Sequence, residues 1–173
     1  MQNDQRVAFD LFYAEHAMPA YRFALRLSGS AEDAEDLVAE ALAKAYRSWN
    51  QYRGEAHART WLFAIVRNEW RMLCRRRPPL EERIGSVEVL AATLAAESFE
   101  LAQAIQSLPE AQKEAFLLVK GEGLTHAEAA KVVHVPVGTM YFRVHAAVQK
   151  LKTLLADVSE PEPKEKVMCP REM

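Results

Sequence analysis

The stretch LTHAEAAKVVHVPVGTMYFRVHAAVQKLK, residues 124–152, decides the fold of the second half of the chain. Thr125 and Glu128 have the spacing of a capping box, in which two side chains satisfy backbone N–H groups at the start of a helix. The segment VPVG then predicts a short turn before a second helix. Two helices joined in this way predict a helix-turn-helix unit. Arg143 is the only arginine in the stretch, so the second helix carries little positive charge for binding DNA unaided.

Helical signals also fill the first half of the chain. Gly29 fits the left-handed end of one helix, and Ser30 fits the cap of the next, which continues through AEDAEDLVAEALAKAYRSW, residues 31–49. Pro19 is expected to interrupt the preceding helical segment and to start a new helix, because proline suits the first helical turn. The acidic residues of 31–49 recur at spacing four, opposite the apolar stripe, at Glu32, Asp36 and Glu40.

A helix of roughly 20 residues is predicted between the break at Gly54 and the prolines at 78 and 79. Its apolar stripe includes Trp61, Leu62 and Ile65. Its arginines at Arg59, Arg67, Arg71 and Arg75 differ by multiples of four, so they are predicted to share one face. Such a ladder can follow a phosphate backbone. Ordinary surface arginines paired within the helix are the alternative interpretation.

The stretch that follows is acidic and proline-led. Residues 78–108 contain one basic and five acidic residues, a net charge of −4. We interpret 78–104 as a linker with a helical turn near 86–97, which predicts two domains, at 1–77 and 105–157. The polar, proline-containing tail at 158–173 is expected to be disordered.

Composition limits the classes of function. The 173 residues are 50% hydrophobic, and scarce β-branched alternation favours an all-α fold. Cys74 and Cys169 are too few for a disulfide framework. The sequence contains no signal peptide, no apolar run of membrane length, and no metal or catalytic motif. We therefore expect a cytoplasmic binding protein without cofactor or metal that is not an enzyme.

Several coupled motifs resemble one family. The segments AEDAEDLVAEALAKAYRSW, YRGEAHARTWLFAIVRN, RRR and SLPEAQKEAFLLVKGEGLTHAEAAKVVHVPVGT look like the extracytoplasmic-function (ECF) group of bacterial sigma factors, over residues 9–155. The resemblance implies a sigma-two-like domain before the linker and a sigma-four-like helix-turn-helix domain after it. Its implied partners are core RNA polymerase (clamp helices and flap), promoter DNA and an anti-sigma factor, with no direct membrane insertion.

The resemblance also assigns roles to residues. The residues that would bind core polymerase are Asp33, Asp36, Leu37 and Glu40. Those that would contact the minus-ten element are Tyr52, Arg53, His57, Arg59, Arg67, Asn68, Arg71 and Arg75. In the reading helix the chain departs from the family, with Tyr141 and Phe142 where basic or small polar residues are common, so the minus-thirty-five candidates rest on residue chemistry. They are Thr125, Gly138, Thr139, Tyr141, Phe142, Arg143 and His145.

The sequence departs from the family pattern in ways that leave alternatives open. His134 stands where the turn often has glycine, but histidine tolerates a left-handed backbone better than most residues. Trp61 is expected in the core, whereas Trp70 is either exposed or packed, and Phe142 faces either DNA or the core. The weakly charged second helix has two interpretations. Polymerase can tether it and reduce the affinity it needs, or the chain is a sigma mimic that only sequesters an anti-sigma factor.

Overall fold

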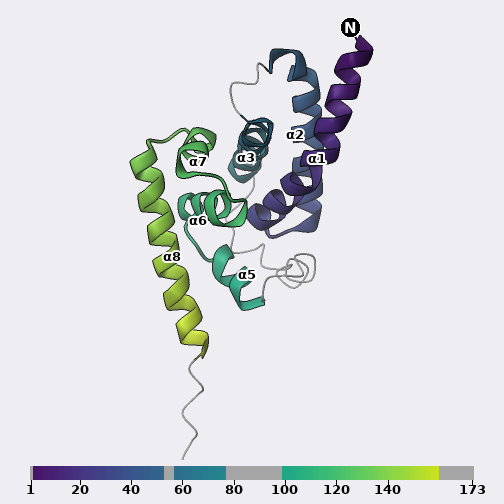
Figure 1. Cartoon of the computed structure of the whole chain (residues 1–173). Coiled ribbons are helices and arrows are strands. Elements are labelled where there is room, and N and C mark those ends of the chain that lie inside the picture. The colour runs from purple at the N-terminus through teal and green to yellow at the C-terminus, as the bar shows by residue number, and fades with distance from the viewer. Residues whose placement is uncertain (1, 53–56, 77–98, 160–173) are drawn as a thin grey trace, which may run out of the picture.

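The computed structural model describes residues 2–52, 57–76 and 99–159, and within these ranges the chain is helical without a strand. The first half contains α1 (Gln2–Ser28), α2 (Ala31–Ser48), the 3-10 turn η1 (Trp49–Gln51) and α3 (Ala58–Arg76). The second half contains α5 (Phe99–Gln106), α6 (Glu110–Phe116), the π-helical turn η3 (Leu117–Gly121), α7 (His126–Val133) and α8 (Val137–Ser159). Figure 1 shows α1, α2 and α3 bundled on one side and α8 along the opposite edge. The all-α fold class with two small helical domains is confirmed.

The predicted helix ends are present. Gly29 has a φ of +69°, and the Ser30 hydroxyl accepts a hydrogen bond of 3.3 Å from the backbone N–H of Asp33. Thr125 and Glu128 form the complete capping box at the start of α7. His134 ends α7 with φ 56° and ψ 52°, in the left-handed conformation that the turn requires. These local signals therefore set the ends of α1, α2 and α7.

The prediction of a break at Pro19 is wrong. Helix α1 runs through Pro19 from Gln2 to Ser28. A proline inside a helix removes one backbone hydrogen bond and costs about 3 kcal/mol. Buried residues on both sides of it, such as Phe12 and Phe23, anchor the two parts of α1 in the core and offset this cost.

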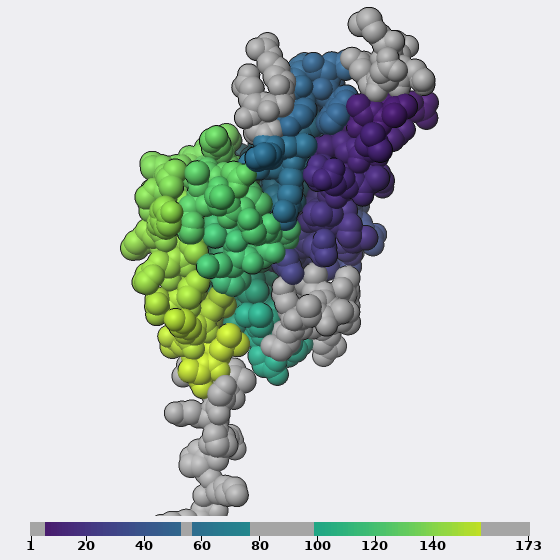
Figure 2. Space-filling view, viewed as in Figure 1, coloured from purple at the N-terminus to yellow at the C-terminus, as the bar shows by residue number. Residues whose placement is uncertain are grey.

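The two halves share one hydrophobic core. Phe23 and Phe63 are fully buried in the first half, with ring centroids 4.9 Å apart, and the buried residues continue into Leu118 and Met140 of the second half. Helix α3 contacts α7, while α1 contacts η3 and α5. Figure 2 shows the two halves packed directly against each other along this face. Domains predicted as separate units therefore pack together.

Of the predicted linker at 78–104, the structure describes residues 99–104. Helix α5 begins at Phe99, inside the predicted linker range 78–104, and its residues Ala102 and Ile105 are buried. The predicted helical turn near 86–97 lies outside the described residues, as does most of the tail with Cys169.

Replacing Phe23 by alanine is expected to lower the free energy of unfolding by about 3–5 kcal/mol, because it removes a fully buried ring from the core. Phe142 offers a matched control, since its side chain is 73% exposed and the same change should cost within roughly 0.5 kcal/mol. Urea unfolding followed by circular dichroism measures both values. Equal losses for the two variants would contradict the core described above.

Candidate functional site

An acidic cavity lies between α2 and α3. Asp33, Asp36, Leu37 and Glu40 all line this cavity of about 140 Å³, because spacings of three and four place them on one face of α2. Helix α3 completes the lining with Glu69, Met72, Leu73 and Arg76. The residues expected to bind polymerase are thus brought together.

The members of this cavity differ in exposure. Asp36 and Glu40 are exposed, whereas Asp33 and Leu37 are 5% and 4% exposed. Leu37 therefore contributes mainly to the core beneath the cavity. The Lys44 ammonium group lies 2.6 Å from the Glu69 carboxylate and ties α2 to α3 at this position. At the rim, the exposed Glu40 carboxylate accepts a hydrogen bond of 3.3 Å from Arg47 and lies 3.7 Å from the Lys44 ammonium group.

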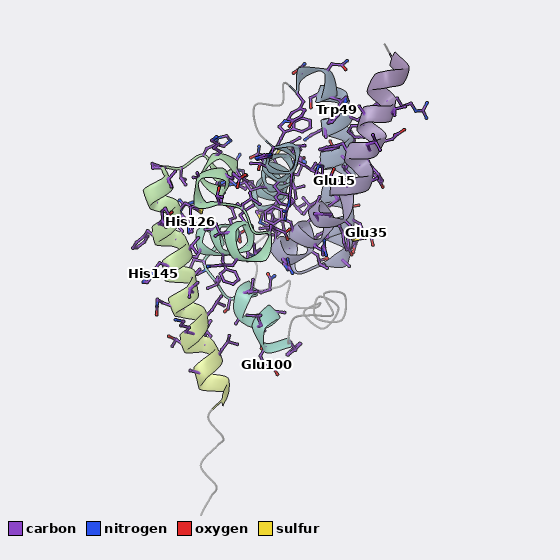
Figure 3. All side chains as sticks on the ribbon, in the orientation of Figure 1. Glu15, Glu35, Trp49, Glu100, His126 and His145 are labelled. Atoms are coloured by element: carbon purple, nitrogen blue, oxygen red, sulfur yellow. The ribbon has the colours of Figure 1, made fainter. Side chains whose placement is uncertain are left out.

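Aromatic side chains gather around Tyr52. Tyr52 is half-buried and stacks on Trp49 and Trp61, with ring centroids 5.7 and 4.8 Å away. Trp49 begins η1, directly after α2 (Figure 3). Trp61 packs against the core, as predicted. Arg53 falls outside the described residues, and His57 is exposed, 3.8 Å from the Glu128 carboxylate of the second half.

The second half covers the first part of the arginine ladder on α3. Arg71 and Arg75 are exposed, and so is the neighbouring Asn68. Arg59 is half-buried, and Arg67 is only 5% exposed. The ladder is therefore divided into an exposed C-terminal part and a covered N-terminal part. The sequence did not indicate this, because the covering residues lie more than 40 positions away.

Charged groups pair across the contact between the halves. Nε and Nη2 of Arg67 both donate to a Glu114 carboxylate oxygen at 3.2 Å. Arg59 and Arg26 each place a guanidinium nitrogen 3.0 Å from the Glu122 carboxylate. Arg59 also donates to the backbone carbonyl of Glu122. Burial raises the pKa of Glu114, and the nearby Arg67 opposes this rise.

Lys113 occupies the centre of the same contact and is fully buried. Its Nζ donates to the backbone carbonyl of Leu27 at 3.0 Å and lies 3.1 Å from the Glu110 carboxylate. Nζ also lies 5.6 Å from the Trp70 ring centroid, while the Trp70 Nε1–H donates to Glu110. Trp70 is therefore packed and fully buried. Sequence reasoning missed Glu110, Lys113 and Glu114, because charged residues on a short helix look like ordinary surface.

Helix α8 presents the residues expected to read DNA. Tyr141 and Phe142 are 57% and 73% exposed, so Phe142 does not pack in the core. The Tyr141 ring stacks on His126 of α7, with ring centroids 3.8 Å apart. His145 is exposed on α8 (Figure 3). Arg143, two residues earlier on the same helix, is half-buried.

The N-terminal turn of α8 contains two further residues that are expected to contact DNA. Gly138 is exposed and Thr139 is half-buried there. Thr125 is exposed at the start of α7 and remains engaged with Glu128. The structure therefore places the expected minus-thirty-five residues on two neighbouring helices.

Among residues 2–52, 57–76 and 99–159, His, Cys, Asp and Glu side chains form no group that could hold a metal ion. No helix in the same ranges is long and apolar enough to cross a membrane.

Comparisons with known proteins place both halves. Residues 12–78 match the model of Sigma-70 region 2, and residues 98–151 match that of Sigma-70, region 4. The chain is 37% identical to the ECF RNA polymerase sigma factor EcfG of Rhodopseudomonas palustris, over 80% of this chain and 81% of the relative. It is 30% identical to the RNA polymerase sigma-H factor of Pseudomonas aeruginosa, over 91% of this chain and 93% of that protein.

Solved structures show the same arrangement of helices. The sigma factor RpoE of Bartonella quintana, crystallised with the anti-sigma factor NepR, matches with a TM-score of 0.70 and 26% identity, over 88% of this chain and 99% of that one. CnrH in complex with the cytosolic domain of CnrY matches with a TM-score of 0.71 and 25% identity, over 90% of this chain and 91% of that one.

Replacing Thr125 by valine is expected to raise the pKa of Glu128 toward its ordinary value of 4.5. The Thr125 hydroxyl and backbone N–H donate to the Glu128 carboxylate at 2.7 and 2.8 Å and lower its pKa in the wild type. A lowered carboxylate pKa stabilises the fold above the unfolded-state value, and this contribution disappears as the pH falls through the folded-state value. The stability difference between wild type and variant, about 0.5–2 kcal/mol at neutral pH, should therefore shrink on acidification.

Carboxyl chemical shifts in an NMR titration give the pKa, and unfolding at several pH values gives the stability. Thr153→Val is the control, because that threonine is exposed on α8 and bonds only the Gln149 carbonyl. An unchanged Glu128 pKa in Thr125→Val would contradict the capping geometry.

Proposed function

The chain belongs to the ECF group of the sigma-70 family, and we propose that it binds core RNA polymerase and directs initiation at specific promoters. Sigma factors are transcription initiation factors and not enzymes. The acidic cavity is the observation that carries the proposal. It joins Asp36 and Glu40, both exposed, to the buried Asp33 on one face of α2. Such a surface fits basic side chains on the polymerase clamp helices, because complementary charge sets register and on-rate.

The aromatic group of Trp49, Tyr52 and Trp61 supports a role in minus-ten recognition. Stacked aromatic side chains beside a loop can receive an unstacked base, and contacts of this kind favour the open strand. Asn68, Arg71 and Arg75 are exposed on α3 and can reach the strand as the structure stands. Arg59 and Arg67 can do so only after the second half moves away, because they contact Glu122 and Glu114.

Helix α8 supports a role in minus-thirty-five recognition. Its first-turn amides, near Gly138 and Thr139, can hold a phosphate. Tyr141 and Phe142 offer apolar edges to thymine methyl groups, while Arg143 and His145 offer donors to bases or phosphates. Polymerase tethers the unit, so α8 needs discrimination more than affinity.

An anti-sigma factor is the proposed regulator. RpoE of Bartonella quintana was crystallised with the anti-sigma factor NepR, and CnrH with the cytosolic domain of CnrY. This chain shares their fold over most of its length, which supports a similar partner here.

Reversing charge in the acidic cavity should weaken polymerase binding. The double variant Asp36→Lys/Glu40→Lys is expected to lose at least about tenfold in affinity for core polymerase, because like charges then face the clamp helices. Glu35→Lys is the control, since Glu35 is exposed on the same helix but lines a separate groove against α1. A pull-down or gel shift with sigma-free core polymerase measures binding.

In the same assay, absence of binding by the wild type would refute the sigma proposal. Polymerase binding without transcription from any promoter would favour the sigma mimic instead. Transcription from the promoter upstream of its own gene is the outcome we expect.

Replacing Tyr141 or Arg143 by alanine should weaken discrimination at the minus-thirty-five element by about 1–3 kcal/mol, because each removes a contact to a base or phosphate. Polymerase binding should be unchanged, since α8 lies apart from the acidic cavity. Transcription from templates with altered minus-thirty-five bases measures the first effect, and the pull-down measures the second. A loss of polymerase binding would show that α8 has been assigned to the wrong partner.

A further inference from the structure

Carboxylates of the second half bind guanidinium groups of the first half in the way that a phosphate would. Glu122 lies 3.0 Å from both Arg26 and Arg59, and Glu114 accepts the two hydrogen bonds from Arg67. The side chains of Glu114 and Glu122 are 4% and 5% exposed, so little water competes for these contacts. Guanidinium groups bind carboxylates and phosphates with the same fork of donors.

We propose that Glu114 and Glu122 act as internal substitutes for DNA phosphate, which hold the two halves in a closed arrangement that excludes promoter DNA. The inference rests on the proposed function. It assigns a regulatory role to two glutamates that lie outside both expected DNA-contacting sets.

Mutual exclusion follows from the geometry. A phosphate on Arg67 or Arg59 would have to displace a carboxylate that the same guanidinium already binds. The displacement requires α6 and η3 to leave α3, because both glutamates belong to this segment or directly follow it. DNA binding at the N-terminal part of the ladder and contact between the halves therefore cannot coexist.

The closed arrangement is suited to reversal. Paired charges lose hydration when they are buried, and this loss offsets much of their attraction. The raised pKa of Glu114 reflects this, since Arg67 does not fully compensate for burial of the carboxylate. When the halves separate, all of these groups regain water. The apparent affinity for DNA is then reduced in proportion to the fraction of molecules that is open.

The conformational test compares the full chain with Glu114→Gln/Glu122→Gln by small-angle X-ray scattering. The amides keep the size of the side chains and remove their charges, so we expect a larger radius of gyration. Glu100→Gln is the control, because Glu100 is exposed on α5, away from α3 (Figure 3). Circular dichroism should show the same helix content in all three proteins. An unchanged radius of gyration with intact helices would overturn the proposal.

The binding test uses the same proteins with core polymerase and with a fluorescently labelled single-stranded DNA of mixed sequence. Opening should raise the affinity of the double variant for the DNA by about tenfold or more, while the control stays at the wild-type value. The affinity for core polymerase should be the same for all of these proteins, because the acidic cavity on α2 is exposed in the closed arrangement as well. An open variant with unchanged DNA affinity would show that closure does not limit DNA binding and would overturn the proposal. If neither protein binds polymerase although the variant opens, the proposed function fails while the closed contact stands.

A charge exchange covers the case in which the amide variant misfolds. Glu114→Arg alone places two guanidinium groups together and should open the chain. Arg67→Glu/Glu114→Arg restores an opposite-charge pair and should close it again by scattering, while single-stranded DNA binding stays low because Arg67 is gone. If Arg67→Glu/Glu114→Arg keeps the larger radius of gyration of Glu114→Arg, the proposed role of the Arg67–Glu114 pair is overturned.

Discussion

A buried arginine must have a counter-charge, because its guanidinium stays protonated at any pH that a folded protein meets. In this molecule the requirement is satisfied across the contact between the two halves. Arg67 of α3 is 5% exposed and finds its carboxylate on Glu114 of α6. Each half therefore carries charges that only the other half can balance. The packing of the two halves depends on this charge pairing across their contact.

Lys113 extends the same constraint into the centre of the contact. Its ammonium group is fully buried and is satisfied by the Leu27 carbonyl at the end of α1 and by Glu110 beside Trp70. Apolar packing alone would tolerate small shifts between the halves. Hydrogen bonds to a buried cation do not, since each unsatisfied donor costs free energy. The polar contacts thus fix how the shared hydrophobic core is assembled.

The consequence for function is a division of the surface. The contact covers Arg59 and Arg67, whereas the acidic cavity on α2 and the outer side of α8 stay accessible. Surfaces proposed for polymerase and for the minus-thirty-five element are thus exposed while part of the proposed minus-ten surface is not. The proposed order is therefore polymerase first and the full set of promoter contacts second.

The local elements could be predicted from the sequence, because their causes lie within a few residues. Ser30, the capping box at Thr125 and the left-handed His134 each satisfy or set backbone geometry close by. The α2 residues of the acidic cavity were indicated by the family resemblance, because helical spacing alone grouped Asp36 and Glu40 with Glu32 and placed Leu37 on the apolar side. Pro19 was misjudged because the packing that carries α1 through it comes from other helices. The exposure of Trp70 and Phe142 was undecided for the same reason.

The sequence by itself determined the helices, their caps, the family motifs and the presence of an arginine ladder. Only the tertiary structure decided which of those arginines are accessible. Glu114 and Glu122 lie 47 and 63 positions from the arginines that they bind, and nothing in the local pattern marks them as partners. Charge pairing at such separation is set by how whole helices pack. That packing follows from the combined burial of apolar and ionic groups, which no single segment encodes.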